Sequence, residues 1–404
     1  MTRTGVIRSR LARLAHPRAK RSPAAATLDA AVSEPGRPVP TGSHPTAAPS
    51  AVGDVERALH RAGAVAADDP MGAIEILSKA NRQQRDPRLE LRLLELRTRA
   101  FASRSWPTTR CPWPDAVPDQ FPGAAIPEIG AAELSVERVR SALAHHGAVI
   151  VRGLIGPEFV DRLVADVDGA LAAYDRQADS GRPADGAPEF VPFRHWPSGE
   201  KKVIERVFRR AAGGVLAVDA PGAMFDLIET FDAVGIGALV REYFGEEPAI
   251  LARKWTLRRV PRDGANGDWH QDGAFMGRDI RSLNVWVSLS DCGSDAPGID
   301  VVARPLDDIV PTGTHGARMS WTVSPAVVDE VAAGAVVRPR FAPGDVLLFD
   351  HLNLHRTAVD PGMMRDRYAI EAWFLAPSTY GAMTSNDDEL PESQLPIVYA
   401  SRAT

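Results

Sequence analysis

The chain has 404 residues, of which 44% are hydrophobic and 25% are charged, as in ordinary soluble globular proteins. It carries 47 basic and 52 acidic residues, and seven of the basic residues precede the first acidic residue, Asp29. The remaining chain therefore holds 40 basic against 52 acidic residues, which argues against nucleic-acid binding by the folded part.

Two cysteines, Cys111 and Cys292, are too few for a disulfide framework or a cysteine-based zinc site. No stretch approaches the roughly 18 consecutive apolar residues of a membrane span, and the basic N-terminus lacks the apolar segment of a secretory signal. We therefore predict a cytoplasmic protein without a membrane span. An Arg-rich, acid-free start is also typical of an organelle transit peptide, and that alternative stays open.

The first half of the chain divides by composition. Residues 1–50 are rich in Ala, Pro, Arg, Ser and Thr, so we expect a disordered tail. Residues 51–105 have helical periodicity, and Asp69-Pro70 and Asp86-Pro87 each place a capping carboxylate before a proline at the first helical position. We predict a small helical segment here, and contact with a partner is one role that it could serve.

Residues 106–127 carry six prolines and predict an extended linker, so the main domain is expected to cover residues 128–404. Its start predicts helices after Ser135 and from Pro157, with a β-rich run at residues 148–152 between them. Turn residues then separate short β segments at residues 250–260, 282–289, 299–302, 336–341, 346–349 and 368–374. This pattern favours an α+β fold in which helices buttress an antiparallel sandwich or jelly roll.

The tripeptide His270-Gln271-Asp272 is the first candidate for chemistry. In an extended chain, residues i and i+2 point to the same face, so the imidazole and the carboxylate would converge while Gln271 points away. Such a pair is half of a metal site. Alone it is a weak signal, because a buried histidine followed by a turn aspartate is an equally good reading.

His355 supplies a third candidate ligand, 83 residues after Asp272 and beyond a Pro-Gly-Asp turn and a strand. Two neutral imidazoles and one carboxylate occupy one face of an octahedron and leave three adjacent positions open. Open positions indicate catalysis, whereas structural metal sites are closed. His351 and His355 at helical spacing could instead bind zinc, but no acidic general base follows the first histidine.

The order of several elements resembles the phytanoyl-CoA dioxygenase family of Fe(II)- and 2-oxoglutarate-dependent oxygenases. These elements are His-Gln-Asp at residues 270–272, an aromatic-bearing strand at residues 283–289, Pro-Gly-Asp at residues 343–345, the distal His355, and Arg-Tyr-Ala-Ile-Glu at residues 367–371. The resemblance covers residues 129–377 and implies a double-stranded β-helix, a jelly-roll, cupin-like barrel with iron inside one mouth.

The resemblance also implies roles for individual residues. His270, Asp272 and His355 match the metal ligands, and Arg367 matches the arginine that binds the far carboxylate of 2-oxoglutarate, as a planar guanidinium does well. Thr357 matches a hydroxyl that helps to hold that carboxylate, and Trp286 matches a tryptophan of the co-substrate pocket. Arg365 is the rival anchor, but it lies in the turn before the strand.

The implied activity is a dioxygenase reaction in which 2-oxoglutarate and O2 hydroxylate a C–H bond of a small-molecule or lipid-like substrate, releasing succinate and CO2. Two alternatives stay open. One is a jelly-roll binding or scaffold protein with a vestigial metal site, and the other is the same site chemistry leading to desaturation, epoxidation or cyclisation. Asp272 argues against the related halogenases, which replace this carboxylate by a small residue.

Residues 297–305 depart from the family pattern, because Pro-Gly-Ile-Asp stands where a Pro-Gly-Ser-His-like turn is common. The substrate mouth is therefore expected to differ from that of acyl-thioester hydroxylases. We expect residues 188–225 and 304–321 to shape the pocket, and His195 lies in the first of these segments.

Overall fold

The structure, a computed structural model, describes residues 51–106, 117–180, 188–193, 200–382 and 395–399. All of these belong to one compact unit, Pro49–Thr404. The predicted tail, residues 107–116 of the predicted linker, Cys111 within them, and His195 lie outside the described residues.

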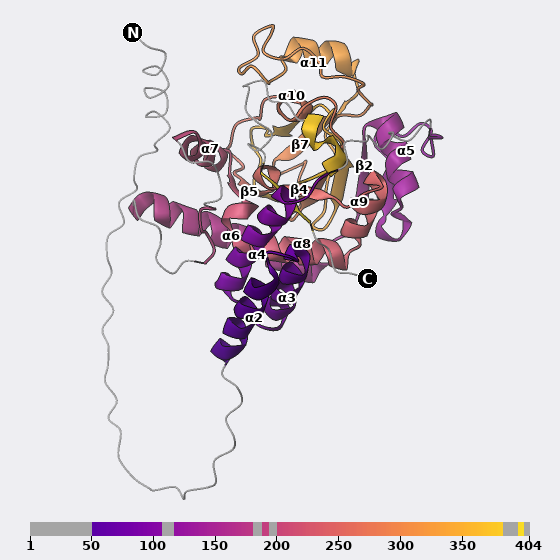
Figure 1. The fold of residues 1–404 in the computed structure, drawn as a ribbon. Coiled ribbons are helices and arrows are strands. Elements are labelled where there is room, and N and C mark those ends of the chain that lie inside the picture. Colours follow the sequence, from indigo (N-terminus) through magenta and orange to yellow (C-terminus); the bar gives the residue numbers. More distant parts are fainter. Residues whose placement is uncertain (1–50, 107–116, 181–187, 194–199, 383–394, 400–404) are drawn as a thin grey trace, which may run out of the picture. The chain divides into compact units, whose positions relative to one another are not determined.

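The predicted helical segment consists of three helices, α2 (Ala51–Val65), α3 (Pro70–Gln83) and α4 (Pro87–Ala102) (Figure 1). Asp69 accepts a hydrogen bond from the Gly72 N–H at 2.8 Å, and Asp86 accepts one from the Arg88 N–H at 2.9 Å. Because a proline has no N–H to leave unpaired, it fits the first position of α3 and of α4. The capping carboxylates and prolines therefore start both helices where the sequence predicts.

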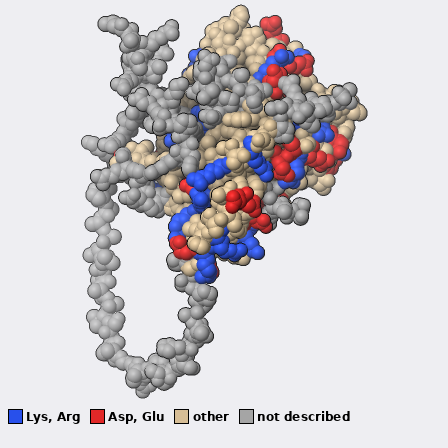
Figure 2. All heavy atoms as spheres, in the orientation of Figure 1, with Lys and Arg blue, Asp and Glu red and all other residues tan. Residues whose placement is uncertain are grey.

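These helices pack directly on the rest of the unit. Helix α4 lies against β12 (Pro396–Val398) and α8 (Pro221–Ala233), and its buried Arg97 donates hydrogen bonds to the carbonyl oxygens of Val398 and Tyr399. Arg82 of α3 pairs with Glu229 of α8 at 2.7 Å. Basic and acidic side chains lie side by side over this part of the surface (Figure 2).

Nine strands of the described chain form the larger of two sheets. Seven follow one another in the order β1-β2-β9-β6-β11-β4-β12, while β5 pairs with β11 and β3 pairs with β5. The strands β1 and β2 are parallel and the other neighbours are antiparallel. Their bounds are β1 Glu128–Gly130, β2 Ala148–Arg152, β3 Gly214–Leu216, β4 Ala249–Leu251, β5 Thr256–Val260, β6 Ser282–Ser288, β9 Val346–Phe349 and β11 Arg367–Leu375.

The smaller sheet is β10-β7-β8, with bounds His355–Ala358, Gly298–Val302 and Val336–Val337. Ile299 and Val301 of β7 share an apolar core with Trp286, Leu347 and Phe349 of the large sheet, so the two sheets face each other. A large, mainly antiparallel sheet and a small antiparallel sheet closed around one core make a double-stranded β-helix. The predicted fold class is confirmed.

Helices cover the other face of the large sheet. Because side chains alternate along a strand, Val285 and Val287 point away from Trp286, into a second core that they share with helices. Leu143, Leu163 and other buried residues of these helices complete that core. The covering helices include α5 (Val136–His146), α6 (Pro157–Ser180), α8 and α9 (Ile236–Phe244). Within the described residues, no helix is both long and apolar enough to cross a membrane.

The predicted strand at residues 250–260 is interrupted. The short 3-10 helix η3 (Ala252–Lys254) separates β4 from β5, although both strands pair with β11. The three residues of η3 are inserted between the two segments that pair with β11. Such insertions, like β-bulges, are common beside functional sites. The strand predicted at residues 336–341 shortens to β8, and the strands β1, β3 and β12 were not predicted.

Gly147 links α5 to β2 at a point where the chain must turn sharply. It has a φ of 75°, in the left-handed region that ends helices, and a Cβ placed on it would lie 2.5 Å from the carbonyl oxygen of Arg304. Gly153 has a φ of 62° but no atom within 4 Å of such a Cβ. Both glycines have a positive φ, but only Gly147 would bring a side chain into contact with neighbouring backbone. Comparing the two positions therefore distinguishes backbone strain from steric overlap.

We expect Gly147→Ala to cost more stability than Gly153→Ala. The control should lose about 1 kcal/mol from the left-handed conformation, whereas overlap with the Arg304 backbone should raise the loss at Gly147 to about 3 kcal/mol. Urea unfolding of both variants measures the difference. Equal losses would show that the approach of Arg304 has no energetic consequence.

Candidate metal centre

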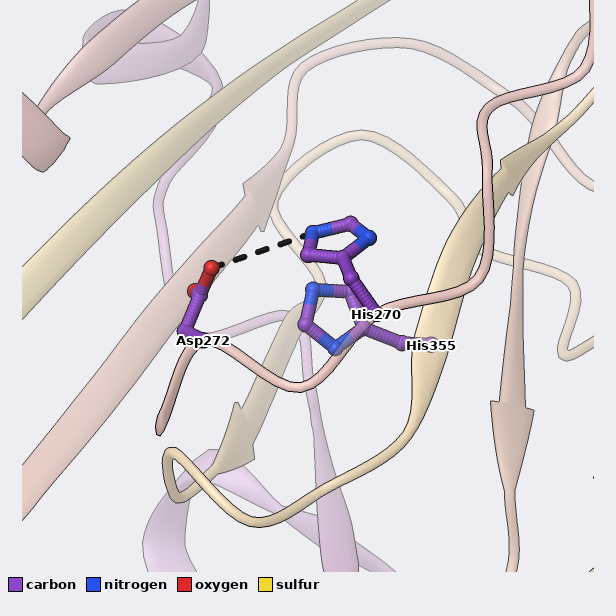
Figure 3. Close-up of side chains that lie close together, drawn as sticks. All are labelled: His270, Asp272 and His355. Carbon is purple, nitrogen blue, oxygen red and sulfur yellow. Dashed lines mark ion pairs between the residues drawn. The ribbon is translucent and has the colours of Figure 1, made fainter. Parts of the chain in front are cut away.

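Two histidines that are distant in the sequence face each other across a pair of backbone hydrogen bonds. The His270 N–H donates to the His355 carbonyl and the His355 N–H to the His270 carbonyl, both at 3.1 Å. Residues directly opposite each other in an antiparallel pair present their side chains on the same face. This single bridge therefore brings the two ring centroids to 4.4 Å from each other (Figure 3).

Asp272 reaches the two rings by a different route from the one predicted. The extended conformation ends at His270, and Asp272 has helical dihedral angles (φ −65°, ψ −24°) just before the short helix α10 (Gly273–Met276). The turn is fixed by the Gly273 N–H, which donates to the His351 carbonyl at 2.8 Å. Asp272 Oδ1 then lies 3.8 Å from His270 Nε2 (Figure 3).

His270, Asp272 and His355 each offer one ligand atom, and these atoms lie within 4.8 Å of one another. Both imidazoles are oriented by backbone carbonyls: His270 Nδ1 is 2.9 Å from Asp268 O, and His355 Nδ1 is 3.0 Å from Asn353 O. Because a carbonyl oxygen can only accept, each Nδ1 donates to its carbonyl, and Nε2 is the ring nitrogen left to bind a metal. The donor set thus fits a metal ion.

Burial sets the charge of these ligands. Burial, together with the neighbouring His355, lowers the pKa of His270 to about 4, so the ring is neutral near pH 7. Burial alone would raise the pKa of Asp272, but the neighbouring Lys254 ammonium, followed by smaller effects of the two imidazoles, outweighs burial and leaves that pKa below its usual value. Two imidazole nitrogens and one carboxylate are a ligand set for a divalent cation.

Gln271 points away from the ligands and ties three backbone segments together. Its Nε2 donates to the carbonyls of Asp308 at 3.0 Å and Leu352 at 2.7 Å, and its Oε1 accepts from the Val310 N–H at 2.8 Å. The side chain is fully buried. The residue between the two ligands therefore fixes the loop before His355 and the loop that leads to Trp321.

Arg367, Thr357 and Trp286 form a second cluster inside the barrel. The Arg367 guanidinium, on a residue only 1% exposed, donates to the Gly298 carbonyl and to Thr357 Oγ1, the latter at 3.4 Å, and lies 5.5 Å from the Trp286 ring. Burial lowers the pKa of Arg367 to about 10, so it remains charged near pH 7. Thr357 and His355 are two apart on β10 and share a face.

The bonding of Arg367 is incomplete. Among the described residues no carboxylate pairs with it, and its buried Nε has no hydrogen-bond partner. A buried cation with only neutral partners is costly unless a ligand supplies the missing charge. Arg365 differs, because it is exposed and pairs with Asp295 at 2.8 Å and Asp291 at 3.3 Å. Of the two arginines, only Arg367 is placed to bind an anion inside the barrel.

Sequence reasoning missed three side chains around the triad. Lys254 Nζ lies 3.7 Å from Asp272 Oδ1. The rings of Phe275 and Trp321 lie 6.4 Å and 5.7 Å from the His270 ring, and 5.6 Å from each other. The predicted strand 250–260 holds four basic residues, so its sequence did not single out Lys254. Trp321 comes from the segment that was expected to shape the substrate pocket.

The remaining polar residues near the sequence motifs make contacts that stabilise the fold. His351 Nε2 donates to the Arg278 carbonyl at 2.9 Å, and residues 351–354 form a turn without the helix that a zinc pair at i and i+4 would need. Asp345 accepts a hydrogen bond from the Ala342 N–H of its own turn at 2.9 Å, and it also pairs with Arg152 at 2.6 Å at the end of β2, so its contacts are structural. In the divergent segment, Asp300 pairs with Arg338 and Arg356.

No protein-family model and no curated protein sequence matches the chain. Among solved structures, EvdO2 from Micromonospora carbonacea var. aurantiaca, complexed with 2-oxoglutarate, is 16% identical with a TM-score of 0.39, covering 59% of this chain and 90% of its own. EctD from S. alaskensis, with 2-oxoglutarate and 5-hydroxyectoine, is 18% identical with a TM-score of 0.40, covering 58% and 74%.

The carbocyclase SnoK from nogalamycin biosynthesis, described as non-heme and alpha-ketoglutarate dependent, is 14% identical with a TM-score of 0.40, covering 61% of this chain and 85% of its own. Similarities at this level say nothing about the chemistry of this chain. The case for a function therefore depends on the side chains of the two interior clusters.

Gln271 provides a test of how the triad is held. Gln271→Glu keeps the size of the side chain but removes both N–H donors and faces two carbonyl oxygens with another oxygen, so we expect a loss of about 3 kcal/mol in stability. Weaker binding of a divalent metal should accompany it. Gln177→Glu on α6, where the side chain is only partly buried, is the control. Unchanged urea unfolding and metal affinity in Gln271→Glu would contradict this role.

Proposed function

We propose that the protein is an Fe(II)- and 2-oxoglutarate-dependent oxygenase that oxidises a small-molecule substrate, with His270, Asp272 and His355 as metal ligands. The observation that carries the proposal is the pairing of two interior clusters: a triad of two histidines and one aspartate, and a buried arginine that has no anionic partner among the described residues. A dicarboxylate that chelates a metal at one end needs both. The order of sequence motifs supports membership of the phytanoyl-CoA dioxygenase family.

The donor set fits a non-haem iron(II) ion. A two-histidine, one-carboxylate face is typical of non-haem Fe(II) oxygenases, because it leaves adjacent positions for a chelating co-substrate and O2. When bound, iron and 2-oxoglutarate supply the oxidising chemistry, in which one oxygen atom of O2 enters succinate with loss of CO2 and the other oxidises the substrate.

Side chains and backbone carbonyls of the protein would position the metal, the co-substrate and the substrate for this reaction. The Asp268 and Asn353 carbonyls hold both imidazoles with Nε2 toward the common centre. Arg367 and Thr357 would bind the far carboxylate of 2-oxoglutarate, with Trp286 as a wall of its pocket. Phe349, whose ring is 4.8 Å from that of His355, helps to exclude water on the inner side. Phe275 and Trp321 then border the substrate, in keeping with a pocket shaped by residues 304–321.

Hydroxylation is the outcome that we propose, and desaturation, epoxidation and cyclisation use the same ligand set. Product mass separates them, because hydroxylation adds one oxygen atom while desaturation and ring closure remove two hydrogen atoms. A jelly-roll scaffold protein with a vestigial site would bind neither iron nor 2-oxoglutarate. Anaerobic titration with both therefore tests the proposal directly.

We expect anaerobic Fe(II) and 2-oxoglutarate to give a weak visible charge-transfer band with the wild-type protein and none with Asp272→Ala. Removing the only anionic ligand of the triad should lower metal affinity by at least about 100-fold, and 2-oxoglutarate-dependent succinate formation should stop. Asp268→Ala, which keeps the backbone carbonyl that orients His270, is the control. Full succinate formation by Asp272→Ala would remove this assignment.

Arg367 and Arg365 make a matched pair for the co-substrate. Because a buried bidentate contact to a carboxylate contributes about 3 kcal/mol, Arg367→Gln should weaken 2-oxoglutarate binding by about 100-fold. Iron affinity measured without 2-oxoglutarate should change little. Arg365→Gln removes the same charge from the surface and should leave both constants unchanged. Similar 2-oxoglutarate affinity in the two variants would show that Arg367 is not the anchor.

A further inference from the structure

One surface loop leaves the metal centre and returns to it on either side of a single ligand. The Val310 N–H donates to Gln271 Oε1 at 2.8 Å, and the Val323 N–H donates to the Trp269 carbonyl at 2.8 Å. Both acceptors belong to sequence neighbours of His270, so the loop between the two valines begins and ends beside that ligand. Surface loops with close ends, known as Ω-loops, are frequently functional.

The loop between these anchors, residues 311–322, has few contacts with the rest of the described chain. Its backbone hydrogen bonds there are internal, such as the one from the Gly313 N–H to the Thr322 carbonyl at 2.9 Å, and most of its residues are exposed. Arg318 pairs with Asp268 at 3.5 Å, but the Arg318 side chain is 71% exposed, so this ion pair contributes little. A segment with so few buried contacts can move while its ends stay fixed.

Trp321 is the large side chain that joins this loop to the metal centre. Its ring lies 5.7 Å from the ring of His270 and 5.6 Å from that of Phe275, edge to face in both cases. Trp321 is partly buried, whereas residues 318–320 before it are exposed. Edge-to-face contacts are individually modest, so only a small difference in free energy favours the arrangement in which Trp321 covers His270.

We propose that residues 311–322 form a lid, which opens on its two anchors to admit ligands to the metal centre and closes when Trp321 returns to His270. The inference rests on the proposed function, since it concerns access to the same site. Because the backbone anchors at Val310 and Val323 stay paired, the lid can open without moving the ligand. A closed lid would exclude water from the reaction and hold the substrate in place.

A gate has a kinetic signature that a binding contact lacks. It changes the rates of entry and exit of a ligand by the same factor and leaves the dissociation constant unchanged, whereas a lost contact acts mainly on the exit rate. 2-Oxoglutarate is a suitable probe, because its proposed anchor, Arg367, is only 1% exposed, whereas the side chain of His270 beside the lid is 24% exposed. Anaerobic stopped-flow mixing of 2-oxoglutarate with the Fe(II)-loaded protein, followed by the visible charge-transfer band, gives both rates.

Trp321→Ala should speed the association and the dissociation of 2-oxoglutarate by about tenfold each, which is the strength of two edge-to-face aromatic contacts. Trp321→Phe keeps an aromatic edge and should fall between Trp321→Ala and wild type. Met319→Ala, which removes an exposed side chain from the same loop, is the control and should match wild type. Fe(II) affinity without 2-oxoglutarate should be unchanged in all three variants, because none of them alters a proposed ligand.

A second variant replaces residues 312–321 by Gly-Gly, which removes the lid and keeps both anchors. Because the anchors hold the loop ends close together, this short connection can span them. It should exchange 2-oxoglutarate as fast as Trp321→Ala does, and it remains informative if Trp321→Ala is unstable. Thermal melting of each variant without metal separates these results from a loss of folding.

Equal acceleration of both rates in Trp321→Ala and in the shortened variant supports the proposal. Wild-type rates in these variants, or faster dissociation alone with weaker 2-oxoglutarate binding, would overturn the lid while the proposed function stands. If wild-type protein gives no band with Fe(II) and 2-oxoglutarate, both fail.

Discussion

The register of one short strand holds the interior chemistry in place. Strand β10 pairs with β7 so that His355 lies opposite Val301 and Thr357 opposite Ile299, while the bridge to His270 fixes its other edge. His355 and Thr357 therefore both point into the barrel, His355 as a member of the triad and Thr357 toward Arg367. A slip of one residue would turn both outward, because side chains alternate along a strand. The proposed metal and carboxylate sites thus share one structural constraint.

The interior of the barrel contains charged side chains, which a purely apolar core would lack. Arg367 is buried with neutral partners, and Asp272 is ionised beside Lys254 in spite of its burial. Such groups reduce the stability of the protein without ligand, and they persist because a ligand that binds only the folded state offsets that loss. Stability and binding are linked at both clusters: the residues that make the empty barrel less stable are those proposed to hold the metal and the dicarboxylate.

Sequence patterns predicted local features better than the placement of Asp272 and Lys254. The helix starts at Asp69 and Asp86 and the strand around Trp286 depend on neighbouring residues, so the sequence predicts them. The helical turn at Asp272 depends on a contact of Gly273 with the distant His351 carbonyl, and an extended chain was the wrong expectation. Lys254 reaches the triad because η3 interrupts two strands that both pair with β11, and that interruption is visible only once the sheet is assembled.

The contact between α4 and the last described residues also constrains the order in which the chain can fold. Arg97 is buried against the carbonyls of Val398 and Tyr399, and the Tyr399 hydroxyl donates to Asp232 at 2.8 Å. During synthesis, the partners of Arg97 emerge from the ribosome some three hundred residues after it does. The helices α3 and α4 can meet α8 as soon as it has been made, as in the pair of Arg82 with Glu229, but the buried contacts of Arg97 can form only after the C-terminal strand has left the ribosome.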